Sequence, residues 1–316
     1  MAIRPGSSHK PPLIILAGPT GSGKTDVARE LSKRLPIEMI SCDSMQVYKG
    51  LPIVTQAPRA GAGLHLVSCL DPSREFSAAA FRSKALKLIP QILERGRIPL
   101  ICGGTGLYVR ALLDGLFETG RRSRDEAFRK KLLAGQAARG GTYLHDKLRA
   151  VDPASARRIH PNDLRRIVRA LEVRRLTGRC FSEQRPLRSG IRGKYDVSFF
   201  LIDRARGELY ERIDKRVERM LRAGLLAEVR GLCGRPLSRT ASAAIGIRQI
   251  GEYLDGRITK PEAVAGMKQS TRNYAKRQLS WFRHEKDVEP VRVAAGEKAA
   301  ETAERILSLW KKRSSS

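Results

Sequence analysis

The eight residues Gly18-Pro19-Thr20-Gly21-Ser22-Gly23-Lys24-Thr25 decide the fold of this chain. They fit the pattern G-x-x-x-x-G-K-[S/T], follow the apolar run LIILA at 13–17 and precede the helical segment TDVARELSKRL at 25–35. A glycine-rich turn in this position lets backbone N–H groups form an anion-binding nest. Lys24 adds a positive charge, and the Thr25 hydroxyl can ligate Mg²⁺. We therefore expect residues 18–25, the P-loop, to bind a diphosphate, and ATP and an allylic diphosphate offer it the same groups.

Short apolar runs and helical segments alternate around the P-loop. LIILAG, IEMISCD and RIPLICGG are separated by helical stretches, a pattern that predicts a parallel α/β sheet flanked by helices. From about residue 117 to 194 strand signals vanish and Arg-rich helical segments take over, before the strand DVSFFLID at 196–203. We expect a P-loop α/β core in two parts, 1–117 and 195–316, interrupted by an all-helical insertion domain at 118–194. The second part is expected to hold C-terminal helices and a disordered tail.

The chain of 316 residues carries a large excess of positive charge. It has 61 Lys and Arg against 32 Asp and Glu, which leaves a formal net charge of +29. Basic residues recur at helical spacing in three rows, which are Arg165, Arg166 and Arg169, then Arg212, Arg216 and Arg219, and then Lys268, Arg272 and Lys276. Any one row fits a solvated helix face paired with acids at i,i+4, but the acids are too few for all of them. Some rows therefore face a polyanion, and nucleic acid is the leading candidate.

The apolar positions of NDLRRIVRALEVRRL at 162–176 repeat with the period of a helix. Leu164, Ile167, Val168, Leu171 and Leu176 predict a buried stripe, which turns the arginines of this segment toward solvent or a ligand.

Two classes of protein are excluded by simple counts. The longest apolar stretches, such as 13–18 and 197–202, are far shorter than the roughly 18 residues that cross a bilayer. The five cysteines, Cys42, Cys69, Cys102, Cys180 and Cys233, stand singly and none has another Cys or a His at metal-ligand spacing. We expect no membrane span, no structural zinc and a reducing cytoplasm.

Three further positions are candidates for chemistry because they lie at strand ends, where open α/β sheets bind ligands. Asp43 ends the strand in MISCDSMQVYKG and fits a Mg²⁺ ligand, a general base or a helix cap equally well. Gly103-Gly104-Thr105-Gly106 ends the next strand and could bring backbone and a hydroxyl to the same phosphates. Asp203 fits either the acid of a nucleotide hydrolase or the cap of the following helix.

Seven blocks of sequence together resemble one family. In order across about 13–283 they are GPTGSGKT, DSMQVYKG, GGTGLYVRALLDG, NDLRRIVRALEV, ERIDKRVERMLRAGLLAEV, AIGIRQIGEYL and TRNYAKRQLSWFR. They resemble the tRNA dimethylallyltransferases, or IPP transferase family, in the shorter bacterial form. The resemblance implies transfer of a dimethylallyl group from dimethylallyl diphosphate to N6 of adenosine 37 in tRNAs that read codons beginning with U. It also implies a cytoplasmic monomer that uses Mg²⁺ and binds the anticodon stem-loop, with tRNA contacts from the insertion domain.

The resemblance also assigns roles to residues. Asp43 matches the base, and Thr105 and Arg212 match the residues that hold the leaving diphosphate. The positions that match the tRNA path are Asp43, Ser44, Met45, Gln46, Arg129, Arg165, Arg166, Ile167, Val168, Arg169, Ile245, Gly246, Ile247, Arg248, Gln249, Lys276, Arg277, Gln278, Trp281 and Arg283. The chain departs from the family at PIVTQAP (52–58), at Ile247 where Tyr is usual, and at Ser280 where Thr is usual.

Two other functions use part of this pattern. An ATP-dependent kinase of small substrates needs the P-loop but leaves the basic helical insertion unexplained. A nucleotide-gated nucleic-acid-binding protein uses the charge but has no need of Asp43 beside Thr105 and Arg212.

Overall fold

The computed structural model describes residues 10–59, 61–116, 124–184 and 189–314, and the chain forms two compact units. Unit 1 comprises residues 1–113 and 191–316, and unit 2 comprises residues 114–190. Unit 2 therefore begins and ends slightly before the range 118–194 expected for the helical insertion. Of the Ser-rich tail KKRSSS (311–316), expected to be disordered, residues 311–314 are instead helical at the end of α15 (Ala299–Ser314), and residues 315–316 lie outside the described residues.

Unit 1 is built on a six-stranded sheet with the strand order β3-β2-β4-β1-β5-β6, and every pairing is parallel. The strands are β1 (Pro12–Ala17), β2 (Ile37–Ser41), β3 (Leu64–His65), β4 (Ile98–Gly103), β5 (Asp196–Arg204) and β6 (Val288–Val293). In β1, which lies between β4 and β5, the residues from Leu13 to Ala17 are all buried. A continuous apolar run is expected for a strand that is covered on both faces. The predicted parallel sheet is confirmed.

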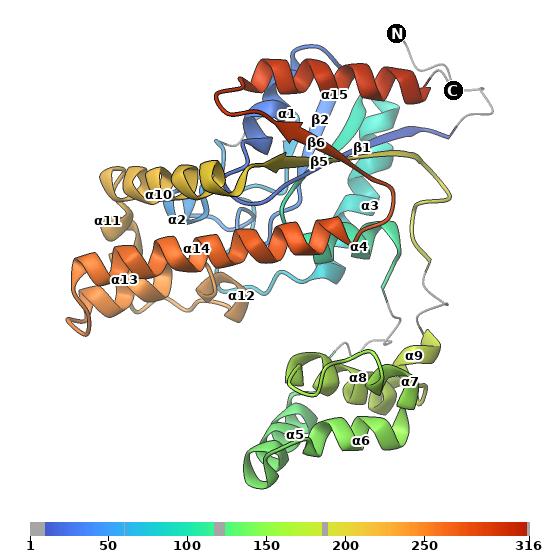
Figure 1. The fold of residues 1–316 in the computed structure, drawn as a ribbon, viewed down its shortest axis with the longest axis vertical. Helices are drawn as coiled ribbons and strands as arrows, with labels where there is room; N and C mark the ends of the chain where they lie inside the picture. Colours follow the sequence, from blue (N-terminus) through green and yellow to red (C-terminus); the bar gives the residue numbers. More distant parts are fainter. Residues whose placement is uncertain (1–9, 60, 117–123, 185–188, 315–316) are drawn as a thin grey trace. The chain divides into compact units, whose positions relative to one another are not determined.

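Helices cover both faces of this sheet (Figure 1). On one face α1 (Lys24–Ser32) and α15 (Ala299–Ser314) pack over Ile14, Leu16 and Phe200. On the other face α3 (Ala78–Glu94), α4 (Gly106–Leu113) and α14 (Lys260–Arg283) pack over Leu13 and Ile15. The two residue sets alternate along β1, because successive side chains of a strand point to opposite faces.

Further helices of unit 1 surround the carboxyl ends of the strands. They are α2 (Pro52–Thr55), α10 (Arg206–Arg222), α11 (Leu225–Arg230), α12 (Arg239–Ser242) and α13 (Ile247–Leu254). Helix α10 follows β5 directly and packs along α14, where Leu209 and Ile213 contact Ala275. These two long helices lie side by side in Figure 1. In the described ranges, none of the helices combines the length and apolar character needed to cross a bilayer.

The described part of unit 2 is helical. It contains α5 (Glu126–Arg139), α6 (Tyr143–Val151), α7 (Pro153–Ala156), α8 (Leu164–Thr177) and α9 (Phe181–Gln184). Helix α8 begins where the Asp163 carboxylate accepts a hydrogen bond from Arg166 N, and it ends at Gly178, whose φ of 71° is left-handed. Its apolar stripe packs against Leu144 and Leu148 of α6.

Candidate active site

Four parallel strands place the predicted donor-site residues at one edge of the sheet. The P-loop follows β1, Asp43 follows β2 and Thr105 follows β4, while Arg204 ends β5. Parallel strands present their carboxyl ends together, which brings these distant segments to one place. One cavity at this edge is lined by Lys24, Thr25, Met39, Ser41, Asp43, Gln46, Pro58, Leu64, Cys102 and Gly103. The P-loop lysine and threonine and the predicted base thus share a cavity.

The P-loop has the backbone that its glycines allow. Gly21 and Gly23 have φ values of 84° and 89°, a left-handed conformation that a side chain would strain. Gly23 is the N-cap of α1, so the first N–H groups of that helix have no partner within it. The Lys24 ammonium donates to Pro19 O at 3.2 Å. Burial lowers the pKa of Lys24, which is expected where a cation is held in place for an anionic ligand.

Three arginines from β5 and α10 donate hydrogen bonds to oxygen atoms of the P-loop. Arg204 Nε donates to Ser22 O at 2.8 Å, and Arg212 Nε donates to Gly21 O at 2.8 Å. Arg216 donates to Thr20 Oγ1 at 3.1 Å. Arg212 was assigned from the resemblance, whereas Arg204 and Arg216 were missed. For Arg216, the available signal was its position one helical turn after Arg212. Arginines at this spacing also occur on solvent-exposed helix faces, so the sequence did not distinguish the two.

Two of these arginines, Arg212 and Arg216, carry a charge that is partly desolvated. Burial and, next, the neighbouring Arg204 guanidinium lower the pKa of Arg212. Burial lowers the pKa of Arg216 to about 10, although the nearby Asp43 carboxylate acts in the opposite direction. Cations that are crowded and partly stripped of water favour an anion between them. The arrangement can therefore hold a diphosphate and neutralise charge that develops on it.

Asp43 and Thr105 are linked through one short turn. Asp43 Oδ1 accepts from Met45 N at 2.9 Å, and Ser44 N donates to Thr105 Oγ1 at 3.2 Å. A Cβ on Gly103 would overlap Cys42 O, so glycine allows the two loops to meet. Asp43 thus caps the turn that follows it and also lines the cavity. Of the three roles left open for Asp43, the helix cap is wrong, because residues 44–47 form a turn and no helix begins there. The general base and the Mg²⁺ ligand stay predictions.

Tyr274 of α14 is a further member of this cluster that the sequence reasoning missed. Burial and, next, the Asp43 carboxylate raise the pKa of Tyr274, while a hydrogen bond with Thr105 acts in the opposite direction. The phenol therefore lies beside Asp43 and Thr105, two of the three predicted catalytic residues. Its signal in the sequence was its spacing of four and seven residues from Gln278 and Trp281, which places all three on one face of a helix.

The predicted tRNA residues of α14 divide between its two faces. Lys276, Arg277 and Arg283 are exposed. Gln278 is only 5% exposed and both ends of its amide bond to backbone, and its place on the tRNA path stays a prediction. Trp281 is half-buried, with the Arg110 guanidinium 4.3 Å from the ring centroid.

One of the two roles expected for Asp203, the cap of the following helix, is wrong. The N-cap of α10 is Ala205, so Asp203 does not cap that helix. Its carboxylate instead lies 3.5 Å from the guanidinium of Arg283 on α14.

In unit 2 the predicted tRNA residues lie in three environments. Arg165 and Arg166 are exposed, as a polyanion contact requires. Ile167 and Val168 are 0% and 4% exposed, with their side chains in the core of the unit, and their place on the tRNA path stays a prediction. The last two, Arg129 and Arg169, donate at 2.6 Å to Glu172, which is fully buried.

The predicted segment Ile245 to Gln249 forms the start of α13. Gly246 has a φ of 116° and is buried, and Gln249 Oε1 accepts from Gly246 N at 3.0 Å. Gln249 is 7% exposed and its amide also donates to Ser270 Oγ at 3.1 Å. Its side chain therefore shapes the turn, and its place on the tRNA path stays a prediction. Arg248 is exposed, while Ile245 and Ile247 are half-buried.

The predicted residues beside Asp43 are half-buried, and so is Asp43 itself. Gln46 Oε1 accepts from Ser41 Oγ at 3.1 Å, and its Nε2 donates to Gln56 O at 3.2 Å. The unusual PIVTQAP segment forms α2, where Glu228 accepts from Ile53 N and Val54 N at 2.8 and 2.7 Å. The departure from the family pattern is thus accommodated by an ordered turn next to the cavity.

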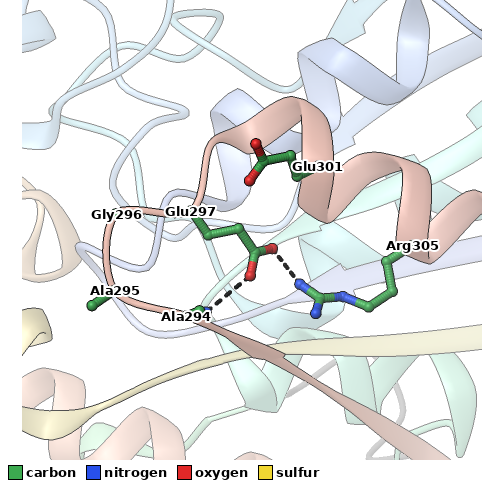
Figure 2. A pocket seen from close by; sticks show the side chains of 6 residues that line it. All are labelled: Ala294, Ala295, Gly296, Glu297, Glu301 and Arg305. Carbon is green, nitrogen blue, oxygen red and sulfur yellow. Dashed lines mark hydrogen bonds and ion pairs between the residues drawn. The ribbon is translucent and has the colours of Figure 1, made fainter.

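A second hollow lies at the turn between β6 and α15 (Figure 2). Burial by itself would raise the pKa of Glu297, but hydrogen bonds from Thr302, Ala294 N and Arg305 lower it to about 2. Because these partners all come from neighbouring parts of the chain, we assign Glu297 to capping the start of α15.

The fold, and the P-loop with its lysine and bonded arginines, define this chain as a P-loop α/β protein. Its site for linked phosphate groups, the phosphate cradle, lies beside a carboxylate. A model of the family described as IPP transferase matches residues 46–285. The chain belongs to the IPP transferase family, and the resemblance shown by its seven blocks is confirmed.

Similar proteins cover nearly the whole chain. It is 43% identical to the tRNA dimethylallyltransferase of Symbiobacterium thermophilum, over 96% of each protein. It is 40% identical to that of Bacillus subtilis, over 89% of this chain and 91% of the relative.

Two solved structures are also similar. A tRNA isopentenylpyrophosphate transferase from Bacillus halodurans has a TM-score of 0.69 and 39% identity, with 97% of this chain and 99% of that chain covered. A eukaryotic dimethylallyltransferase acting on tRNA has a TM-score of 0.74 and 27% identity, with 96% and 77% covered.

Proposed function

We propose that this chain transfers a dimethylallyl group from dimethylallyl diphosphate to N6 of adenosine 37 in tRNAs that read codons beginning with U. The products are N6-(dimethylallyl)adenosine and diphosphate. One observation carries the proposal: the Asp43 carboxylate and the Thr105 hydroxyl lie together beside a P-loop backed by three arginines. The relatives named tRNA dimethylallyltransferase support the same reaction.

The diphosphate is the leaving group, so the site must stabilise negative charge that grows during the reaction. The C–O bond between the allylic carbon and the diphosphate breaks, and its electron pair stays on the diphosphate oxygen. The P-loop N–H groups, Lys24 and Arg212 act on that charge, and such interactions are stronger in the transition state than in the ground state. Thr105 Oγ1 accepts from Ser44 N, and its one O–H is the group that donates to the leaving oxygen when the diphosphate is bound.

The Asp43 carboxylate is the proposed general base. The N6 lone pair forms the new bond to the allylic carbon, and one N6 proton passes to Asp43. A general base of this kind contributes about 10²- to 10⁴-fold to the rate. The hydrogen bond from Met45 N to Asp43 Oδ1 fixes the carboxyl group at the mouth of the cavity.

Thr25 is the proposed protein ligand of Mg²⁺. Its side chain lines the same cavity as Asp43, and hydroxyl and phosphate oxygens are ligands that Mg²⁺ prefers. Clusters of three or more His, Cys, Asp or Glu suited to a metal are absent from the described ranges, which fits an ion held largely by the substrate. When bound, Mg²⁺ neutralises charge on the diphosphate.

The acceptor base must leave the anticodon stack to reach the cavity, at a cost of a few kcal/mol. Contacts between RNA phosphates and exposed cations can offset that cost. The proposed contacts are Lys276, Arg277 and Arg283 of unit 1, and Arg165 and Arg166 of unit 2. Because the donor site is complete within one copy of unit 1, we expect the chain to act as a monomer, in the cytoplasm where tRNA is found.

A direct assay separates this function from its rivals. Purified protein is incubated with an anticodon stem-loop RNA and either dimethylallyl diphosphate or ATP, and the nucleosides are analysed by mass spectrometry. We expect dimethylallyladenosine only with the isoprenoid donor. Consumption of ATP with phosphorylation of a small substrate would establish a kinase, and RNA binding without any modified nucleoside would establish a binding protein.

A further inference from the structure

Helix α14 presents one face to both loops of the donor site. Tyr274, Gln278 and Trp281 occupy that face, since residues four and seven positions apart lie on one side of a helix. The Tyr274 phenol lies beside Thr105, and a Cβ on Gly106 would overlap the Trp281 ring. Lys276 and Arg277, between them in sequence, are exposed. The helix proposed to contact tRNA is therefore also a wall of the diphosphate site.

Gln278 is the member of this face that joins the two loops. Thr20 N of the P-loop donates to Gln278 Oε1 at 2.8 Å, and Gln278 Nε2 donates to Gly104 O at 2.8 Å. The amide can make this pair of bonds in only one orientation, because one loop offers a donor and the other an acceptor. A Cβ on Gly104 would overlap Gln278 Nε2, and it would lie 3.1 Å from Gly18 O, so the loops are held at close approach.

Gln278 and its two hydrogen bonds, to Thr20 N and Gly104 O, form a clamp between the loops. The residues next to this clamp take part in the proposed reaction. The Thr20 hydroxyl accepts from Arg216, and Thr105 follows Gly104 directly and is bonded to Ser44 next to Asp43. A shift of the two loops relative to each other would change the distance from the phosphate cradle to the Thr105 hydroxyl. Misplacement of reacting groups by about 1 Å can cost about 100-fold in rate.

We propose that Gln278 is a positioning residue that sets the separation between the P-loop and Thr105, and so the alignment of the leaving diphosphate. This positioning role rests on the proposed function, since Thr105 acts on the leaving group of that reaction. Gln278 touches loop backbone on both sides and acts through Thr20 and Thr105.

Two replacements test the clamp in different ways. Gln278→Met keeps the length of the side chain and removes both hydrogen bonds. Gln278→Glu keeps the shape and an acceptor for Thr20 N, but its carboxylate lacks the donor for Gly104 O. A protonated Glu regains that donor, because a neutral carboxyl group has one O–H. Burial and the facing carbonyl oxygen favour this neutral form.

We expect Gln278→Met to lower kcat by about 10- to 100-fold with KM for tRNA unchanged, and to weaken binding of inorganic diphosphate in calorimetric titrations. The activity of Gln278→Glu, as a ratio to wild type at each pH, should rise as the pH falls from about 8 to about 6. A merely structural role would lower Tm and the active fraction without this pH signature. If Gln278→Met does not fold, Gln278→Glu tests the proposal alone, since its activity ratio to wild type is compared between pH values and not with another variant.

Two matched controls separate the clamp from general effects of the substitution. Gln269→Met lies on the exposed side of the same helix, and Gln184→Met removes a buried amide from unit 2. Both should retain wild-type binding of inorganic diphosphate.

The outcomes distinguish this inference from the proposed function. Wild-type kcat in Gln278→Met, or a flat pH ratio in Gln278→Glu, would overturn the positioning role even where wild type modifies tRNA. Failure of wild type to modify tRNA would overturn the proposed function, while the diphosphate titrations would still decide whether Gln278 shapes the cradle.

Discussion

Replacing Glu172 by Gln perturbs the basic face of unit 2 at a single buried group. Glu172 is fully buried on α8, where Arg129 Nε and Nη2 and Arg169 Nη1 each donate to its carboxylate at 2.6 Å. Asp125 N donates to it at 2.9 Å. The Gln side chain has the same shape, but it carries no charge and turns an N–H₂ group toward guanidinium donors. The two arginines would lose their common anion.

The structure sets the size of the effect. Removing one partner of a buried ion pair costs about 3 to 5 kcal/mol. Because the side chains of Arg129 and Arg169 are 19% and 32% exposed and can recover some hydration, we expect the lower end of that range. About 3 kcal/mol is roughly a hundredfold in the equilibrium for opening of α8.

Hydrogen exchange measured by mass spectrometry resolves this opening. We expect protection of α5 and α8 to fall in Glu172→Gln. Both tryptophans, Trp281 and Trp310, lie in unit 1, so the denaturant midpoint followed by tryptophan fluorescence should not change. The control is Asp146→Asn in the same unit, an exposed ion pair with Arg149 that is worth less than about 1 kcal/mol. Equal protection of α8 in Glu172→Gln and wild type would refute the reasoning.

The pH dependence of hydrogen-exchange protection in α8 tests the same role of Glu172 in the wild-type protein. Burial alone would raise the pKa of Glu172, but hydrogen bonds from Arg129, Asp125 N and Arg169 lower it to about 2. A carboxyl group whose pKa is lowered by folding stabilises the fold above its ordinary pKa, near 4.5, and this contribution is lost as the pH falls toward 2. Protection of α8, corrected for intrinsic exchange, should therefore decline below about pH 4.5 in wild type and less steeply in Glu172→Gln.

Three further outcomes concern the proposed active site. Asp43→Asn should slow transfer about 10²- to 10⁴-fold while binding of inorganic diphosphate stays near wild type, and near-normal turnover in a single-turnover assay would contradict a general base. Arg216→Met should weaken calorimetric binding of inorganic diphosphate about 10- to 100-fold without lowering Tm, because a desolvated cation is removed; exposed Arg219→Met is the control, and equal losses in both variants would refute a specific role. Affinity for the anticodon stem-loop should fall steeply between about 50 and 200 mM salt, with close to one unit of log–log slope per neutralised phosphate, and a flat response would exclude phosphate contacts by the exposed cations.

The fold could be predicted well because its signals are local. The P-loop, its preceding strand and its following helix are contiguous, and the left-handed glycines at 21 and 23 are required by the turn itself. The apolar runs at 13–17, 98–103 and 196–203 predict buried parallel strands because both of their faces are covered. The strand order β3-β2-β4-β1-β5-β6 is not contained in these local patterns, since it depends on how crossover helices pack.

The site was predicted less completely, and the misses have a common cause. Ile167 and Val168 were assigned to the tRNA path as part of a continuous range, and that assignment stays a prediction. The helical period of the same segment correctly placed their side chains in the core. Arg216 belongs to a row of arginines that looks the same in the sequence whether it faces water or a phosphate, and Arg204 is a single residue at the end of a strand. Burial decides between these environments, and burial depends on what another segment places against the row.

From its sequence alone this chain could be recognised as a P-loop α/β protein with a diphosphate cradle, an acidic residue at a neighbouring strand end and a surface suited to RNA. Only the tertiary structure decided which polar groups meet. Gln278 bonds to Thr20, 258 positions away, and to Gly104, 174 positions away. A turn or a helical period depends on backbone preferences within a few residues, whereas a hydrogen bond over such separations forms only after the sheet and α14 have packed together.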